Sequence, residues 1–180
     1  MTIDADSIQK TRLDTAVNEP LTALASAGAA AFGYTSTLKL DHELAQLLRL
    51  RVAQINDCTY CLGVHYPAAR AAGISQTRID TVSAWWETRL FTSAERAALA
   101  YAEALTRLAD PAVSRGFQQV HEELAAHFEA DVLVEIVGVI VNMNIWTRLK
   151  RAEGAMPTTD MPTADLPTAG VPGTDRRPGA

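Results

Sequence analysis

The sequence predicts an all-α fold. Apolar residues recur at three- and four-residue spacing through most of the chain, which is the period of amphipathic helices. Helix-capping residues precede several of these segments, and glycine or proline follows them. No segment shows the sustained two-residue alternation, bounded by turn residues, that is typical of strands. We therefore expect helices packed around one core.

The first predicted helices lie before residue 56. The alanine-rich residues 20–32 form one helix, which stops at Gly33. Residues 41–55 form the next, because Asp41 is a good N-cap and leucines follow it at helical spacing. The pair Asn56 and Asp57 then breaks this helix.

A helix that begins near Cys58 and ends at Gly73 comes next. Glycine is favoured just after a helix, where the backbone often turns left-handed. Pro67 lies inside this segment and removes one backbone hydrogen bond. We therefore expect a kink beside His65.

Three further helices are predicted in the second half of the chain. Thr92 and Glu95 have the spacing of a capping box and open a helix that stops before Asp110. The following stretch has apolar residues at helical spacing, namely Phe117, Val120, Leu124 and Phe128. Residues 131–146 are apolar nearly all round. At this length we expect a helix buried in the molecule or at a subunit interface, not a membrane span.

The chain divides into three predicted regions. Its 180 residues, 48% of them hydrophobic, suffice for one domain with a substantial core. We place this domain at residues 18–152, after an N-terminal extension of residues 1–17. Residues 153–180 contain repeats of a five-residue unit with proline in second place. Because proline blocks helix propagation, we expect a disordered Pro/Thr-rich tail.

The charge and the termini exclude several classes of function. A formal net charge of -5 at pH 7, without a cluster of basic residues, argues against nucleic acid as a partner. The first residues lack the basic start and apolar stretch of a secretory signal. We therefore predict a cytoplasmic protein, where an accessible Cys-x-x-Cys is more often catalytic than structural.

The chemistry-bearing feature is Cys58-Thr-Tyr-Cys61, followed by His65. A helix turns 100° per residue, so these three side chains share one face. Amide groups at a helix N-terminus stabilise a thiolate and lower its pKa from about 8.5 to roughly 3.5–7.5. His65, one turn beyond Cys61, can exchange a proton near neutral pH. The pattern indicates a redox-active dithiol with an adjacent base.

Other interpretations of the two cysteines remain open. A structural zinc site would need four ligands, and His42, His121 and His127 are not paired at ligand spacing. A static disulfide over so short a loop would constrain little of the unfolded chain. Two buried cysteines and a core histidine could also meet by chance. We expect neither a metal nor an organic cofactor.

Several separated motifs resemble the carboxymuconolactone decarboxylase superfamily, and more narrowly its alkylhydroperoxidase D-like branch. The resemblance extends over residues 18–150, in the segments Gln46–His65, Ala71–Gly73, Trp85–Phe91, Glu95–Ala100 and Asn142–Leu149. It implies a compact helical bundle that oligomerises through buried helices, as homotrimers or hexamers. It also implies thiol peroxidase activity.

The resemblance also implies residue roles. Cys61 matches the peroxidatic cysteine, Cys58 the resolving cysteine and His65 the histidine of a proton relay. The family pattern has a glutamate where this chain has Gln46, which cannot take up a proton at ordinary pH. Glu43 or Glu87 could substitute, although a role as a solvated or capping carboxylate is favoured for both. Tyr60 replaces a histidine of the founding branch and could donate a hydrogen bond to a peroxide oxygen.

Three functions are therefore considered. The first is a peroxiredoxin-type alkyl hydroperoxide reductase in antioxidant defence, which takes a small-molecule hydroperoxide and is reduced again by an external dithiol. The second is a general thiol-disulfide oxidoreductase or redox sensor, suggested by the missing glutamate. The third is a non-catalytic helical scaffold. Lactone decarboxylation has no need of a dithiol and ranks last.

Overall fold

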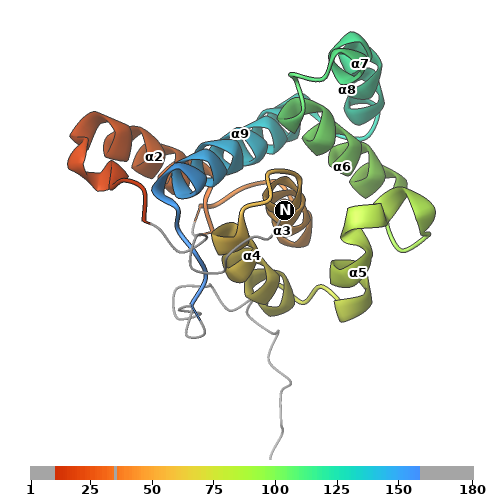
Figure 1. Ribbon diagram of the computed structural model, residues 1–180. Coiled ribbons are helices and arrows are strands. Elements are labelled where there is room, and N and C mark those ends of the chain that lie inside the picture. The colour runs from red at the N-terminus through yellow and green to blue at the C-terminus, as the bar shows by residue number, and fades with distance from the viewer. Residues whose placement is uncertain (1–10, 35, 159–180) are drawn as a thin grey trace, which may run out of the picture.

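The computed structural model describes residues 11–34 and 36–158, and within them every regular element is helical (Figure 1). The predicted all-α class is confirmed. The elements are η1 (Thr15–Val17), α2 (Glu19–Phe32), α3 (His42–Ile55), α4 (Thr59–Ala71), α5 (Gln76–Thr81), η2 (Val82–Glu87), α6 (Ser93–Thr106), α7 (Pro111–Arg115), α8 (Phe117–Ala125) and α9 (Ala130–Glu153).

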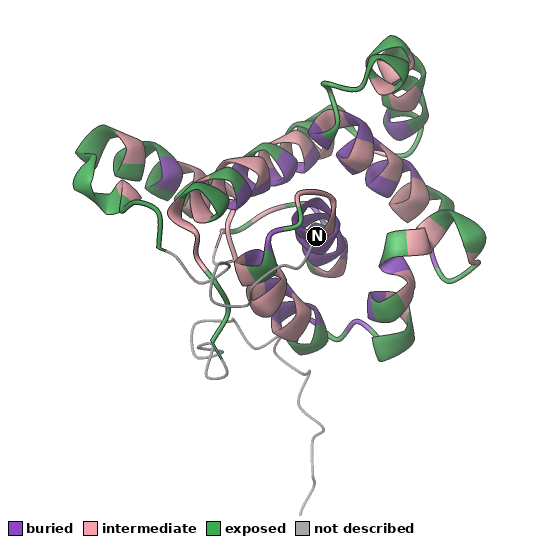
Figure 2. Cartoon of the chain, viewed as in Figure 1, coloured by how far each residue is buried: buried purple, intermediate pink, exposed green. Residues whose placement is uncertain are grey.

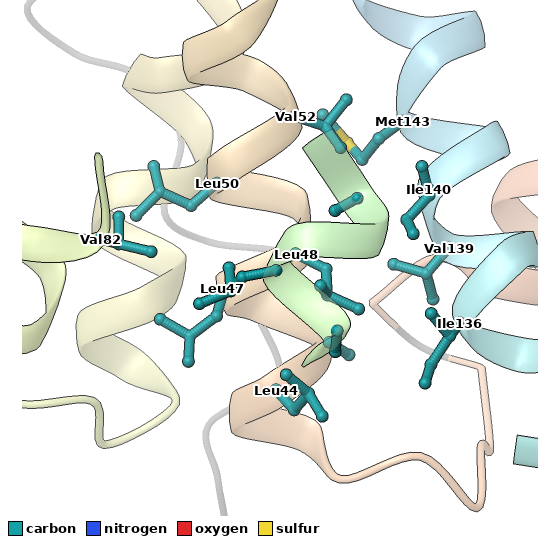
Figure 3. Close-up of a cluster of buried hydrophobic side chains, with 14 of the residues drawn as sticks. Leu44, Leu47, Leu48, Leu50, Val52, Val82, Ile136, Val139, Ile140 and Met143 are labelled. Carbon is teal, nitrogen blue, oxygen red and sulfur yellow. The ribbon is translucent and has the colours of Figure 1, made fainter. Parts of the chain in front are cut away.

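Helix α3 lies at the centre of the fold, with α4, α6 and α9 around it (Figure 1). All ten residues from 44 to 53 are buried, which Figure 2 shows as a nearly continuous purple helix. Its leucines meet apolar side chains of α9, among them Ile136, Val139 and Ile140 (Figure 3). Each fully buried leucine stabilises the fold by about 1.5–3 kcal/mol.

Helix α9 is longer than predicted, because it continues from the apolar segment through a polar last turn to Glu153. It ends where Gly154 adopts a left-handed conformation with φ 70°. By length and composition alone α9 could cross a membrane, a test that core helices of soluble proteins also pass. Its contacts with α2, α3 and α6 show that it is a packing helix of this fold.

Local capping signals in the sequence correctly located several helix ends. The side chain of Asp41 caps α3, and Thr92 and Glu95 form the reciprocal capping box of α6. Gly73 has φ 91°, as expected just after a helix. Pro67 lies inside α4 and does not end it.

The short helices α5, η2 and α7 were not predicted. Each contains five or six residues, fewer than two turns, so hydrophobic periodicity carries no signal for them. They fill the connections between the longer helices. Beyond the end of α9, residues 154–158 form a turn and an irregular segment, and the predicted tail otherwise lies outside the described residues.

Helix α2 stands to one side and packs mainly on α9 (Figure 1). The two helices approach closely at Gly138, where a side-chain Cβ would overlap the ring of Phe32. A second close approach places Gly28 against Asn142, whose Oδ1 would lie 2.7 Å from an added Cβ. The two glycines therefore let α2 dock on α9 and fix the loop that follows α2.

We expect Gly138→Ala to lower the free energy of unfolding by about 1–2 kcal/mol, measured by urea denaturation. Alanine favours helix by about 1 kcal/mol, but its Cβ must push the Phe32 ring aside. Gly116→Ala is the matched control, because a Cβ there has no neighbour closer than 3.8 Å. Equal stability of the two variants would contradict this packing.

Candidate active site

Cys58 and Cys61 form a disulfide at the start of α4, with their Cα atoms 5.2 Å apart. Cys58 is the N-cap, and its sulfur accepts a hydrogen bond from the Cys61 amide at 3.3 Å. The preceding Asp57 has φ 48°, a left-handed conformation that makes the sharp turn out of α3. The predicted position of the dithiol at a helix N-terminus is therefore what the structure shows.

The turn before the dithiol is tied to α9 by hydrogen bonds. Asn56 donates from Nδ2 to Asn144 Oδ1 and to Thr147 Oγ1, each at 3.1 Å. Arg151 donates to the Asn56 carbonyl at 2.6 Å. These contacts hold the first turn of α4 against the last turns of α9.

A cavity of about 380 Å³ opens beside the dithiol. It is lined by Ala29, Gly33, Tyr34, Arg49, Tyr60, Cys61, Val64, His65, Asn142, Met143, Trp146 and Lys150. Val64, Met143 and Trp146 give the lining apolar surface, and Tyr34, His65 and Arg49 form a polar group within it. Cys61 lines the cavity and Cys58 does not, so Cys61 is the sulfur that a small molecule would meet there.

His65 is paired with a tyrosine that the sequence had not indicated. The Tyr34 hydroxyl is hydrogen-bonded to Nδ1 of His65 and lies 3.3 Å from Nε2. The two rings stack with centroids 5.4 Å apart and an interplanar angle of 25°. Tyr34 belongs to the loop after α2, so the docking of α2 on α9 brings it to the site.

Arg49 forms the third member of this group. Its guanidinium lies 5.1 Å from the centroid of the Tyr34 ring, a cation–π contact. It donates to the carbonyl of Phe32, the last residue of α2, at 2.8 Å and to the carbonyl of Gly33, the C-cap of α2, at 3.0 Å. Arg49 therefore fixes the loop that carries Tyr34.

Comparisons with known proteins bear on the family and the fold of this chain. Residues 21–104 match the model of the carboxymuconolactone decarboxylase family. A crystal structure of a protein of unknown function from Agrobacterium tumefaciens, provisionally assigned to antioxidant defence as AhpD, superposes with a TM-score of 0.72 and 28% identity. The alignment covers 83% of this chain and 99% of that one.

The resemblance to the carboxymuconolactone decarboxylase superfamily is confirmed by this match over residues 21–104. The resemblance to its alkylhydroperoxidase D-like branch is also confirmed. The uncharacterized protein YdfG of Bacillus subtilis is 28% identical over 121 residues, which are 67% of this chain and 80% of YdfG. The uncharacterized protein YnjA of Escherichia coli is 31% identical over 113 residues, 63% of this chain and 60% of YnjA.

A further solved structure, an uncharacterized peroxidase-related protein from Silicibacter sp. TM1040, has a TM-score of 0.62 and 19% identity. The alignment covers 81% of this chain and 74% of that one. At this identity the likeness shows the fold alone. The helical arrangement of this chain is thus shared with a protein of low sequence similarity.

Burial shifts the pKa values of His65, Tyr34 and Arg49. His65 is only 5% exposed, and burial, with a smaller contribution from the Arg49 charge, lowers the pKa of His65 to about 3. Burial also raises the pKa of Tyr34 above its usual value and lowers the pKa of Arg49 to about 10. With the disulfide formed, His65 and Tyr34 are both neutral at neutral pH. The expectation of a histidine that titrates near neutral pH is therefore corrected.

Both carboxylates that the sequence suggested as supporting residues lie away from the dithiol. Glu43 pairs with Arg78 at 3.1 Å and does not line the cavity. Glu87 lines a separate surface depression together with Trp86 and Arg89. The structure does not bring either carboxylate to His65.

The other two predicted supporting residues are placed differently. Tyr60 lines the cavity, with Lys150 Nζ 5.4 Å from its ring centroid. Gln46 is 2% exposed on α3, and its Oε1 is buried without a hydrogen-bond partner. Gln46 is not among the residues that line the cavity. The Gln46 side chain is therefore a buried polar group in the core and does not line the cavity.

Sequence reasoning missed Tyr34, Arg49 and Lys150 as site residues. Tyr34 lies in a connection without periodicity, and Arg49 looked like one of several scattered basic residues. Asn142 and Trp146 were expected in a buried apolar helix and in a segment of the family resemblance, but not as site residues. Among the described residues, no cluster of three or more His, Cys, Asp and Glu side chains could hold a metal ion.

The low pKa of His65 predicts an acid-sensitive fold. Between pH 6.5 and about 3, the unfolded chain binds a proton at His65 that the folded chain does not. The free energy of unfolding should therefore fall as pH falls through this window, by up to about 1.4 kcal/mol per pH unit. Urea denaturation across the window should show a shallower slope for His65→Gln. His42→Gln, at an exposed position, is the control, and identical slopes for the two variants would contradict the burial of a neutral His65.

Gln46→Glu should not simply restore the carboxylate of the family pattern. The new carboxyl would be buried beside apolar neighbours, so its folded-state pKa should rise above the unfolded value. Stability should be closest to wild type at acidic pH and fall as pH rises through neutrality, by about 2 kcal/mol or more. Gln119→Glu, at an exposed position, provides the comparison. A Gln46→Glu variant as stable as wild type in mild alkali would show that a partner for the carboxylate exists.

Proposed function

We propose that this protein is a thiol-dependent alkyl hydroperoxide reductase that cycles between a dithiol and the Cys58–Cys61 disulfide. The observation that carries the proposal is the position of Cys61. Its sulfur lies within disulfide reach of Cys58 and borders a cavity that His65 also lines. The match to the family model and the likeness to a protein provisionally assigned as AhpD support antioxidant chemistry.

The reaction follows from thiol chemistry at this site. The Cys61 thiolate attacks the terminal oxygen of R–O–O–H, so an S–O bond forms and the O–O bond breaks. The products are a Cys61 sulfenic acid and an alkoxide, which takes a proton through His65 to leave as the alcohol. The Cys58 thiol then displaces water from the sulfenic acid and forms the disulfide. An external dithiol reduces the disulfide and closes the cycle.

The cavity favours an organic hydroperoxide over hydrogen peroxide. About 380 Å³ is within the size range of sites for small organic ligands, far more than a peroxide group alone requires. Val64, Met143 and Trp146 offer apolar contacts for a carbon chain or ring. The oxygens of such a substrate would lie toward the polar end of the cavity, near Cys61 and His65.

The alternative of a general thiol-disulfide oxidoreductase is less well supported. Cys58 is 2% exposed and Cys61 is 4% exposed, so a folded protein disulfide cannot reach either sulfur without local opening. A small molecule can enter the cavity as it stands. A redox-inert scaffold would be favoured only if both thiols of the reduced protein failed to react.

The proposal includes a cytoplasmic location and assembly into a homotrimer or hexamer. A cytoplasmic protein would find reduced dithiols available, as the cycle requires. The apolar Val134 and Val141 of α9 are 65% and 44% exposed, which supports contact with further copies of the chain in a homotrimer or hexamer.

Cys61→Ser should abolish consumption of an organic hydroperoxide by the reduced protein, because the attacking thiolate is lost. Cys58→Ser should still consume one equivalent in a single turnover and stop as the sulfenic acid, which a sulfenic-acid probe would trap. Cumene hydroperoxide and hydrogen peroxide should be compared, with the larger kcat/KM expected for cumene hydroperoxide. Multiple turnover by Cys61→Ser would remove this mechanism.

A further inference from the structure

The imidazole at this site needs a partner for its second nitrogen. A histidine that handles protons is usually oriented by a hydrogen bond to its other ring nitrogen, and a carboxylate often provides it. The carboxylates suggested by the sequence, Glu43 and Glu87, lie elsewhere, and Gln46 does not line the cavity. The group that does contact His65 is the phenol of Tyr34.

The Tyr34 hydroxyl lies closer to Nδ1 than to Nε2, which is 3.3 Å away, and the shorter contact leaves two possible proton arrangements. Either the Tyr34 hydroxyl donates to an unprotonated Nδ1, or a protonated Nδ1 donates to the phenol oxygen. An unprotonated imidazole nitrogen is a much better acceptor than a phenol oxygen, and a phenol is a better donor than a neutral imidazole. Both groups are neutral, because burial lowers the pKa of His65 and raises that of Tyr34. The first arrangement is therefore the stable one.

We propose that Tyr34 is the positioning residue of the thiol site: its hydroxyl donates to Nδ1 of His65 and confines the imidazole proton to Nε2. The inference deepens the proposed peroxidase function and, as far as activity is concerned, depends on it. The stacked rings fix the tilt of the imidazole as well as its tautomer. Arg49 holds Tyr34 in place through its cation–π contact and its bonds to the Phe32 and Gly33 carbonyls.

The hydrogen bond between His65 and Tyr34 runs in the opposite direction to the usual bond between histidine and a carboxylate. A carboxylate accepts a proton from histidine and makes the imidazole a stronger base, whereas a phenol donates and makes it a weaker one. His65 therefore acts as a hydrogen-bond donor through Nε2–H, able to stabilise the Cys61 thiolate or the departing alkoxide. When Nε2 gives its proton to the alkoxide, Nδ1 takes the proton of Tyr34. The pair is reset when Nε2 takes up the proton that the re-reduced Cys61 thiol releases and Nδ1 returns its proton to the phenolate.

The charges around His65 agree with a donor role. The ionisable groups that line the cavity with it are Tyr34 from the loop after α2, Arg49 from α3, Tyr60 and Cys61 from α4, and Lys150 from α9. No carboxylate belongs to this lining. Positive charge from Arg49 disfavours an imidazolium, and it favours a thiolate or an alkoxide in the same cavity.

The tautomer can be read directly in the oxidised protein. Long-range proton–nitrogen correlation spectra of the protein labelled with ¹⁵N-histidine distinguish a protonated Nε2 from a protonated Nδ1. The chain has 4 histidines, and the spectrum of His65→Gln assigns the signal. We expect the Nε2–H form in the wild type and a mixture of the two tautomers in Tyr34→Phe, which keeps the stacked ring and loses only the hydroxyl.

Steady-state kinetics provide the second readout. Tyr34→Phe should lower kcat with cumene hydroperoxide by about tenfold or more, because the His65 Nε2–H donor is no longer oriented. KM should change little, because the phenylalanine ring still lines the cavity. Tyr66→Phe is the matched control. It removes a phenol hydroxyl from the same helix as His65, at a position whose hydroxyl accepts from Gln54 at 3.2 Å outside the cavity lining.

The outcomes separate the two proposals. An Nδ1–H tautomer in the wild type, or a Tyr34→Phe variant with an unchanged spectrum and unchanged kcat, overturns the role of Tyr34 whether or not the protein is a peroxidase. A wild type that shows the expected tautomer and the expected change in Tyr34→Phe, yet consumes no hydroperoxide, supports the positioning by Tyr34 and removes the peroxidase proposal.

Discussion

The burial of α3 from residue 44 to residue 53 is the constraint on which the rest of the structure depends. Ten consecutive residues of this helix are buried, and they include the polar side chains of Gln46, Arg49 and Arg51. A buried guanidinium costs several kcal/mol unless it is hydrogen-bonded. Arg49 meets this requirement with carbonyls at the end of α2, and Arg51 with Glu103 of α6 at 2.8 Å. The central helix thereby fixes both flanks of the molecule.

The same burial determines what chemistry the site can perform. His65 lies in a low-dielectric environment beside a cation, so it is neutral and its hydrogen bonds, not its charge, orient a reactant. The Cys61 amide donates a hydrogen bond to the Cys58 sulfur at the start of α4, which favours the ionised form of this resolving thiol when it attacks the Cys61 sulfenic acid. Reversible sulfur chemistry is thus supported by helix geometry, and proton movement is supported by the neutral pair of Tyr34 and His65.

Much of the fold was predictable because the signals are local. The cap at Asp41, the box of Thr92 and Glu95, and the left-handed Gly73 each depend on backbone groups within a few residues. The placement of Cys58, Cys61 and His65 on one helix follows from spacing alone. Short helices such as α5 and α7 escaped prediction, since a single turn contains too few residues to show a period.

The amino-acid sequence by itself determined the helices and the redox pair, because both depend on residues close together along the chain. Only the tertiary structure decided which group faces His65. Tyr34 is 31 positions away, and it arrives there because Gly28 and Gly138 let α2 lie close on α9 while Arg49 holds the following loop. The same packing left Glu43 with Arg78 and kept Gln46 out of the cavity lining. Side-chain partners of this kind depend on how whole helices dock, which no local pattern records.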